Sequence, residues 1–209
     1  MKKYVLIIIF ILLQTGCKDQ FYKNVKEVQN PNSTLVLVNK NNKLKDDFIP
    51  DDLIKLDLKY SNKEKYLKKD AALSFYKLSS DAYELGYSII IVSGYRSYTY
   101  QEELFKYYVN NKGINYALMC SAKAGHSEHQ TGLAIDVEGS NKDYNLFEES
   151  KEFKWMNENA YKYGFILRYP KGKEDITGFK YEPWHYRYVG IEVAKEIYEN
   201  NLTLEEYFK

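Results

Sequence analysis

The chain is 209 residues long, which suits one globular domain with an extension, and its 44% hydrophobic content is enough to fill one core. Its 30 basic and 29 acidic residues give a formal net charge of +1, and no long basic run occurs, so nothing indicates a nucleic-acid partner. The sequence contains only two cysteines, Cys17 and Cys120, and a framework of disulfides is therefore not expected.

The first 17 residues, MKKYVLIIIFILLQTGC, have the pattern of an export signal. Two lysines precede an apolar run from Tyr4 to Leu13, which is too short to span a bilayer as a permanent helix. Gly16 and Cys17 resemble a bacterial lipobox, in which the cysteine carries lipid and becomes the mature N-terminus. We expect an exported protein at the extracytoplasmic face of a bacterial membrane, lipid-anchored at Cys17, with simple secretion or an uncleaved anchor as the alternatives.

Residues 18–47 are polar and rich in Asn, Lys and Asp, with one short apolar island at residues 35–38. This composition predicts a tether that leads into a single domain of residues 48–209.

The first half of this domain alternates between helical and extended patterns. Apolar residues at helical spacing predict a helix over residues 62–85, which Gly86 ends. The β-branched run YSIIIV predicts a buried strand over residues 87–92. The loop SGYRS follows it, and the capping box Thr99-x-x-Glu102 then opens a helix that Gly113 closes.

The second half continues this mixture without regular β-α-β alternation. The expected elements are a strand from residue 133, a helix over 148–163 ended by Gly164, a strand over 165–169, a strand or turn over 181–189, and helices over 190–200 and from the capping box Thr203-x-x-Glu206 to the C-terminus. This order predicts an α+β fold with a single domain, in which helices flank a largely antiparallel central sheet.

The segment HSEHQTGLAIDV contains two of the three histidines in the chain. Strand alternation from Leu133 places Asp136 on the side opposite the apolar residues. His129 lies seven residues before Asp136, and Gly132 between them allows the backbone to bend, so the imidazole can approach the carboxylate.

A histidine and a carboxylate supply two of the three protein ligands of a catalytic zinc ion. The third histidine, His185, lies in YEPWHYRYV, three residues after Glu182. His129, Asp136 and His185 therefore form a candidate metal site, with Glu182 free to act on a bound water molecule. The alternative is that His129 and Asp136 are only a hydrogen-bonded polar pair.

The segments SGYRSYTYQ, SAKAGHSEHQTGLAIDV, YGFILRYPKGKEDITGF and YEPWHYRYV closely resemble the VanY-type D,D-carboxypeptidases and the related L,D-carboxypeptidases of the LAS metallopeptidase group. The resemblance covers roughly residues 35–200. It implies the LAS, or hedgehog-like, fold, one zinc ion on the three ligands, and Glu182 as the general base and acid. It also implies that Arg96, Gln101 and Ser121 contact the terminal D-alanine carboxylate or the developing oxyanion.

These features predict a zinc-dependent D,D-carboxypeptidase that acts on peptidoglycan stem peptides, is expected to be a monomer and meets the membrane only through its signal or lipid anchor. An L,D-carboxypeptidase would use the same zinc ligands. An endopeptidase fits less well, because Arg96 is expected to bind a free carboxyl terminus. A non-catalytic, zinc-stabilised wall-binding module is a further alternative, but such a module has no use for Glu182.

Other residues near these motifs have less specific predictions. His126 is expected to occupy a surface loop unless it supports the ligands or the substrate. Trp184 is expected to belong to the core or, alternatively, to form a wall of the pocket. Lipidation of Cys17 would leave Cys120 without an intramolecular partner, and a role as a small buried hydrophobic residue is favoured over that of a reactive thiol.

Overall fold

The computed structural model describes residues 21–209. The predicted export signal and Cys17 lie outside these residues. Among the helices of residues 21–209, none combines the length and the apolar character that crossing a membrane requires.

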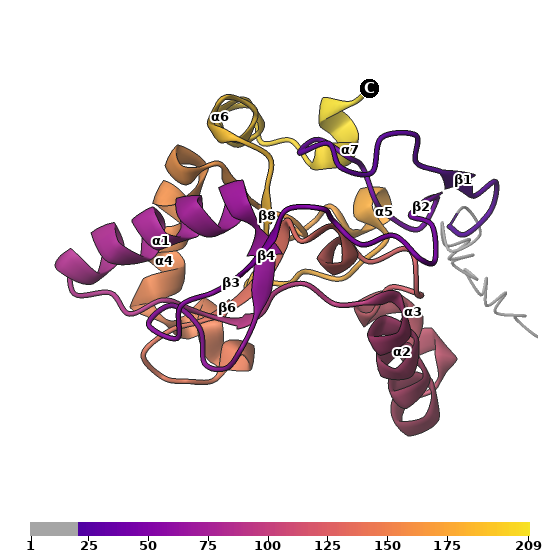
Figure 1. Ribbon diagram of the computed structural model, residues 1–209, viewed down its shortest axis with the longest axis horizontal. Coiled ribbons are helices and arrows are strands. Elements are labelled where there is room, and N and C mark those ends of the chain that lie inside the picture. Colours follow the sequence, from indigo (N-terminus) through magenta and orange to yellow (C-terminus); the bar gives the residue numbers. More distant parts are fainter. Residues whose placement is uncertain (1–20) are drawn as a thin grey trace, which may run out of the picture.

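A four-stranded sheet lies at the centre of the molecule (Figure 1). Its strands follow the order β5-β6-β8-β7. The strands are β5 (Ile90–Ser93), β6 (Ala134–Glu138), β8 (His185–Tyr188) and β7 (Phe165–Leu167). All neighbouring strands in this sheet are antiparallel. The predicted α+β class with an antiparallel central sheet is confirmed.

Helices α1 (Lys69–Glu84) and α4 (Lys151–Asn159) lie together beside the sheet (Figure 1). Phe75 and Leu78 of α1 belong to the same buried cluster as Ile135 and Val137 of β6. Because side chains alternate along a strand, the residues between these two point to the opposite face. The apolar face of β6 therefore packs in the core, and its other face is free to carry polar groups.

The remaining elements are shorter or lie at the edges of the molecule. They are β1 (Lys26–Glu27), β2 (Asn42–Lys43), β3 (Leu53–Lys55), β4 (Tyr66–Lys68), α2 (Tyr98–Lys112), α3 (Ile114–Cys120), α5 (Glu174–Thr177), α6 (Ile191–Glu199) and α7 (Leu204–Tyr207), with 3-10 turns η2 (Glu128–Thr131), η3 (Tyr144–Glu149) and η4 (Ala160–Tyr163).

The helix predicted over residues 62–85 begins later than expected, at Lys69. The preceding residues form β4, which pairs with β3 in antiparallel register. Leu67 is fully buried in this strand and lies four residues before Ala71. A buried strand residue at that spacing mimics one more helical turn, so the sequence pattern alone placed the start of the helix too early.

The caps of two other helices also differ from the prediction. Helix α2 begins at Tyr98, because the side chain of Ser97 accepts a hydrogen bond from the backbone N–H of Tyr100 at 3.2 Å. Thr99 therefore lies inside the helix and does not cap it. Ser150 likewise accepts from the N–H of Phe153 and starts α4 at residue 151. The predicted end at Gly113 and the capping box Thr203–Glu206 are confirmed. Helix α4 itself ends at Asn159, and the 3-10 turn η4 continues the helical segment as far as Gly164.

The prediction of a polar tether is wrong for residues 21–47, which pack on the domain. Val38 and Leu44 are fully buried in a cluster that includes Leu133. The N–H of Leu44 donates to the carbonyl oxygen of Gly125 at 2.8 Å. A few apolar residues at the right places therefore anchor a segment whose overall composition is polar.

Because this segment is packed on the domain, truncating Leu44 is expected to lower the stability of the protein substantially. Leu44→Ala should lower the free energy of unfolding by about 2–5 kcal/mol, because it leaves a cavity in a fully buried cluster. Urea denaturation of the purified protein measures this change. Leu58→Ala is the matched control, since Leu58 is 67% exposed and its truncation should cost less than about 0.5 kcal/mol. Equal effects of the two variants would mean that Leu44 is not packed in solution.

Candidate metal and catalytic site

The turn η2 carries His129 toward the sheet, and Gly132 makes this possible. Gly132 has a φ of 68°, and a Cβ at this position would lie 2.8 Å from the side chain of Leu53 and 3.1 Å from the backbone nitrogen of Lys68. Glycine is therefore required both by its conformation and by the close approach of β4. The predicted bend between His129 and Asp136 is confirmed.

Hydrogen bonding leaves one nitrogen of His129 facing the site. Its Nδ1 lies 2.7 Å from the carbonyl oxygen of Gly94, to which it donates. The tautomer with a proton on Nδ1 leaves the lone pair of Nε2 free to bind a metal ion. Burial lowers the pKa of His129 to about 4, and the neutral imidazole that a metal requires is thus favoured.

The sheet brings Asp136 and His185 together from distant parts of the chain. They occupy paired positions on the neighbouring strands β6 and β8. His185 Nδ1 lies 3.1 Å from Asp136 Oδ1, and His129 Nε2 lies 3.4 Å from Asp136 Oδ2. One ligand atom from each of the three buried residues falls within 4.8 Å of the others.

This donor set fits a zinc ion. Zinc–ligand bonds of about 2.1 Å in a tetrahedral site place neighbouring ligand atoms roughly 3.4 Å apart, close to the distances found here. Within residues 21–209, the buried atoms His129 Nε2 and Asp136 Oδ1 have no hydrogen-bond partner. Burial opposes protonation of His185, but the carboxylates of Asp136 and Glu128 raise its pKa to about 9. The electrostatic field at this position therefore favours a positive charge.

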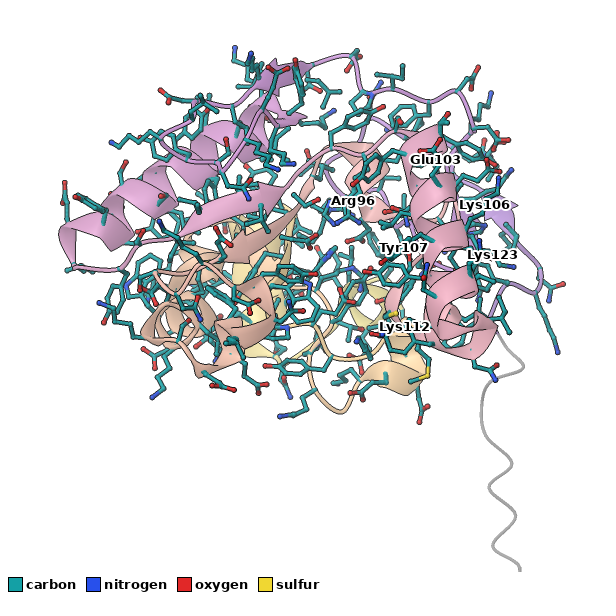
Figure 2. All side chains as sticks on the ribbon, turned by 90° about the horizontal axis from the view of Figure 1, so that it is seen from below. Arg96, Glu103, Lys106, Tyr107, Lys112 and Lys123 are labelled. Carbon is teal, nitrogen blue, oxygen red and sulfur yellow. The ribbon has the colours of Figure 1, made fainter. Side chains whose placement is uncertain are left out.

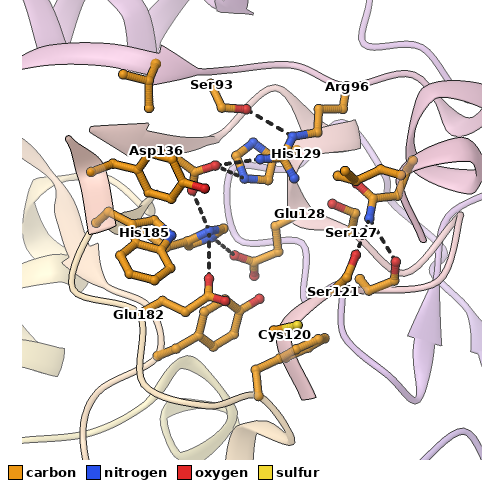
Figure 3. A pocket seen from close by; sticks show the side chains of 18 of the residues that line it. Ser93, Arg96, Cys120, Ser121, Ser127, Glu128, His129, Asp136, Glu182 and His185 are labelled. Atoms are coloured by element: carbon orange, nitrogen blue, oxygen red, sulfur yellow. Dashed lines mark hydrogen bonds and ion pairs between the residues drawn. The ribbon is translucent and has the colours of Figure 1, made fainter. Parts of the chain in front are cut away.

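Glu182 stands next to this cluster, as predicted. Its Oε2 lies 3.8 Å from His185 Nδ1, and the side chain lines the same cavity as the three ligands (Figure 3). Burial raises the pKa of Glu182 to about 7, and the nearby Asp136 acts in the same direction. A carboxylate with a pKa near neutrality is suited to accept a proton and to return it.

Arg96 lies at the ligand cluster, in the space beside α2 (Figure 2). Its Nη2 is 2.5 Å from Asp136 Oδ2, and its Nε donates to Ser93 Oγ at 3.0 Å. Nη1 makes no hydrogen bond with the described part of the chain. The guanidinium group is thus held in place by two contacts and still has donors for a ligand.

Gln101 and Ser121 meet on the wall formed by α2 and the end of α3. Gln101 is 1% exposed, and its Nε2 donates to Ser121 Oγ at 3.2 Å and to the carbonyl oxygen of Ala122 at 2.8 Å. Its Oε1 has no hydrogen-bond partner among the described residues. Both side chains line the cavity, whose volume is about 390 Å³.

Glu128 was not predicted as a site residue from the sequence, and its side chain is fully buried between two arginines. Its Oε1 accepts from Arg168 Nε at 2.8 Å and from Arg187 Nη1 at 2.9 Å. Although burial opposes ionisation, these two guanidinium groups hold the pKa of Glu128 well below its usual value. Its Oε2 faces His185 Nε2 at 3.8 Å, and Arg168 also binds both carboxylate oxygens of Glu205.

Two signals in the sequence point to this network. Glu128 directly precedes the ligand His129, and Arg168 lies among apolar residues in the predicted strand FILRY. A charge in a buried strand requires a partner, because an unpaired buried charge is strongly destabilising. The sequence alone does not tell which carboxylate provides it.

The structure also shows where the three residues with less specific predictions lie. The expectation of a surface position for His126 is wrong: the residue is buried, its Nδ1 lies 2.8 Å from the carbonyl oxygen of Asn39, and it does not line the cavity. Trp184 both packs against the core and lines the cavity. Cys120 is half-buried at the cavity wall, and burial raises the pKa of its thiol.

Comparisons with known proteins agree with this geometry. The family model of VanY, described as D-alanyl-D-alanine carboxypeptidase, matches residues 64–191. The putative carboxypeptidase YodJ of Bacillus subtilis (strain 168) is 44% identical over 92% of this chain and 75% of its own length.

Two solved structures share the fold. The LdcB LD-carboxypeptidase, whose structure addresses peptidoglycan recognition, is 46% identical, with a TM-score of 0.83 over 89% of this chain and 90% of that chain. A mutant of the vancomycin-resistance D,D-pentapeptidase VanY, solved with Zn(II), is 34% identical, with a TM-score of 0.70 over 84% of this chain and 99% of that chain. The present chain belongs to the VanY family of carboxypeptidases.

Proposed function

We propose that this protein is a zinc-dependent D,D-carboxypeptidase that removes the C-terminal D-alanine from peptidoglycan stem peptides. The observation that carries the proposal is the convergence of His129, Asp136 and His185 beside Glu182 in one cavity, in a chain of the VanY family. A wall-binding module without activity would not need Glu182 at this position.

His129 Nε2, a carboxylate oxygen of Asp136 and His185 Nδ1 would hold a single zinc ion. Among residues 21–209 this is the one group of histidine, cysteine and acidic side chains with suitable spacing. Zinc at such a site polarises a carbonyl group and lowers the pKa of water to about 7.

Glu182 would move the proton during hydrolysis. Its carboxylate accepts a proton from the attacking water molecule and delivers it to the nitrogen of the scissile peptide bond as that bond breaks. The products are free D-alanine and a peptide shortened by one residue. The pKa of about 7 lets the same group act as base and then as acid.

Arg96, Gln101 and Ser121 would contact the terminal carboxylate of the substrate or the developing oxyanion. The unused donors of Arg96 and the hydroxyl of Ser121 can donate hydrogen bonds to these negatively charged oxygens. Gln101 keeps Ser121 in position, because its amide group already donates to the Ser121 oxygen.

L,D-carboxypeptidase activity is the second candidate function. The similarity to the LdcB LD-carboxypeptidase, at 46% identity, favours it. The two activities use the same metal ligands and differ in the configuration of the residue on the acyl side of the scissile bond. The shape of the acyl subsite therefore decides between them.

Stem peptides of two lengths test this proposal. The zinc-loaded protein should release D-alanine from a pentapeptide stem that ends in D-Ala-D-Ala, and a chelator should abolish this release. Mass spectrometry of free D-alanine is the measurement. Release from the tetrapeptide stem alone would replace the D,D assignment with L,D activity, and absence of release from either stem would contradict a carboxypeptidase.

Glu182→Gln is the matched control for this assay. The variant should retain zinc, since Glu182 is not among the proposed ligands, and should lose at least about 100-fold in activity, because an amide cannot accept the proton. Zinc content by atomic absorption verifies the first point. Full activity of the variant would remove Glu182 from its assigned role.

Glu128 is proposed to position His185 for metal binding. His185 can bind zinc through Nδ1 only if its proton lies on Nε2, and the negative charge of Glu128, whose Oε2 lies 3.8 Å from that nitrogen, favours a proton there. Glu128→Gln keeps an oxygen for the two arginines but can turn an N–H toward His185. Zinc affinity, measured by competition with a chelating indicator, should therefore fall by about 10- to 100-fold.

Glu205→Gln is the control for that variant. Glu205 binds the same Arg168 but makes no contact with a ligand, so its neutralisation should lower stability while zinc affinity stays within about 2-fold. Thermal denaturation of both variants checks the loss of stability. An equal loss of zinc affinity in both would indicate general destabilisation and not positioning of His185.

We propose further that residues 1–17 direct export and that Cys17 carries a lipid anchor. The lysines, the apolar run and the Gly16–Cys17 pair support this interpretation. In a bacterial host the protein should incorporate labelled fatty acid and sediment with the membrane fraction. Cys17→Ala should abolish both, and labelling that persists in this variant would contradict the assignment of Cys17.

A further inference from the structure

Lys40 is a buried cation in the N-terminal segment, and it has no carboxylate partner among residues 21–209. The residue is 5% exposed, and its Nζ donates hydrogen bonds to the carbonyl oxygens of Leu118, at 2.6 Å, and of Gly178. Burial lowers the pKa of Lys40 to about 8, so the side chain still carries a positive charge at neutral pH. Because burying a charge is unfavourable, packing alone does not explain a lysine at this place.

Three aromatic rings surround the ammonium group of Lys40. Its Nζ lies 4.5 Å from the centroid of the Phe179 ring, 5.0 Å from that of Phe21 and 5.7 Å from that of Tyr22. The faces of aromatic rings attract a cation. The rings and the two carbonyl oxygens together replace water as the partners of the charge.

The two carbonyl oxygens belong to different walls of the cavity. Leu118 lies in the last turn of α3, where carbonyl groups lack partners within the helix. Gly178 follows α5 and lies four residues before Glu182. Between them, the N–H of Lys180 donates to the carbonyl oxygen of Met119 at 3.0 Å. The end of α3 is thus bonded, at two adjacent places, to the segment that leads to Glu182.

The end of α3 leads directly to the residues that are proposed to bind the carboxylate of the substrate. Ser121 follows the helix, and its N–H donates to the carbonyl oxygen of Ala117 at 2.9 Å. Its Oγ accepts from Gln101 at 3.2 Å. Ser121 and Glu182 face the cavity from different parts of the chain (Figure 3). A displacement of α3 would therefore move Ser121 relative to Glu182.

Phe179 gives Lys40 a second connection with the cavity. The ring of Phe179 lies 5.0 Å from that of Tyr169, and both residues form a buried cluster with Ala122, the residue after Ser121. Phe179, Tyr169 and Ala122 line the cavity, whereas Lys40 does not. Lys40 therefore supports this wall from outside the cavity.

We propose that Lys40 is a positioning residue of the carboxypeptidase: it holds α3 against the segment that leads to Glu182 and thereby keeps Ser121 where its hydroxyl can donate to the terminal carboxylate of the substrate. The proposal rests on the proposed function and adds to it a residue that touches neither the substrate nor the metal ligands. A misplacement of about 1 Å at such a site can lower the rate by about 100-fold.

Stem peptides with a free or an amidated C-terminus separate positioning from general damage. Wild-type protein and Lys40→Met are each assayed on a pentapeptide stem that ends in D-Ala-D-Ala and on the same stem with a C-terminal amide. Wild-type kcat/KM should be higher for the free acid. Lys40→Met should lower kcat/KM by about 10-fold for the acid but by less than about 2-fold for the amide. A variant that only contains less folded protein would lower both values equally.

A double-mutant cycle tests whether Lys40 acts through Ser121. Ser121→Ala should lower kcat/KM for the acid stem about as much as Lys40→Met does, and adding Lys40→Met to Ser121→Ala should lower it by less than about 2-fold more. Independent losses that multiply in the double variant would overturn the proposal. An unchanged ratio of acid to amide cleavage in Lys40→Met would also overturn it.

Leu44→Ala is the matched control, since it loosens the same N-terminal segment without removing the bonds of Lys40. It should retain the wild-type ratio of acid to amide cleavage, and a loss equal to that in Lys40→Met would overturn the specific role of Lys40. Lys40→Gln, which keeps an N–H donor, takes the place of Lys40→Met if that variant does not fold, and it should also reduce the ratio.

Failure of the proposed function is distinguishable from failure of this inference. If the wild-type protein cleaves neither stem, the proposed function fails separately. Calorimetric binding of both stems to the zinc-loaded proteins then decides the inference. Tighter binding of the acid stem that depends on Lys40 supports it, and equal binding of the two stems overturns it.

Discussion

The antiparallel pairing of β6 with β8 is the constraint on which the site depends. It places Asp136 opposite His185, although the two residues are separated by helices and turns along the chain. Strand side chains alternate between faces, so a shift of the register by one residue would turn one of the two into the core. The packing of Ile135, Val137 and Tyr186 in one buried cluster fixes this register. The apolar core thereby positions the polar site.

A buried network of charges connects this pairing to both ends of the domain. Arg187 of β8 donates to Glu128 and to the carbonyl oxygens of Thr34 and Val36 in the N-terminal segment. Arg168 joins Glu128 to Glu205 in α7. Removing one partner of such a network leaves a buried charge unpaired, at a cost of about 3–5 kcal/mol. The N-terminal segment therefore belongs to the domain, and Glu128 links its attachment to the ligand His185.

The cavity is lined by both acidic and basic side chains. Near the ligands, the carboxylates of Asp136, Glu128 and Glu182 create a field that favours a cation. Arg96 lies at the edge of this field and offers hydrogen-bond donors to an anion. Such a gradient gives a peptide with a negative terminus a preferred direction. A candidate cation site and donors for a carboxylate thus lie next to each other in one cavity.

The sequence determined the fold class and most elements, and it predicted the three candidate metal ligands and Glu182, because strand alternation, capping residues and a scarcity of histidines are local signals. It did not reveal that residues 21–47 pack on the domain, since Leu44 and Val38 are too few to stand out in a polar segment. It also mistook β4 for helix, because Leu67 is buried at helical spacing from Ala71. Only the tertiary structure showed that Glu128 faces His185, because partners brought together by strand pairing leave no fixed spacing in the sequence.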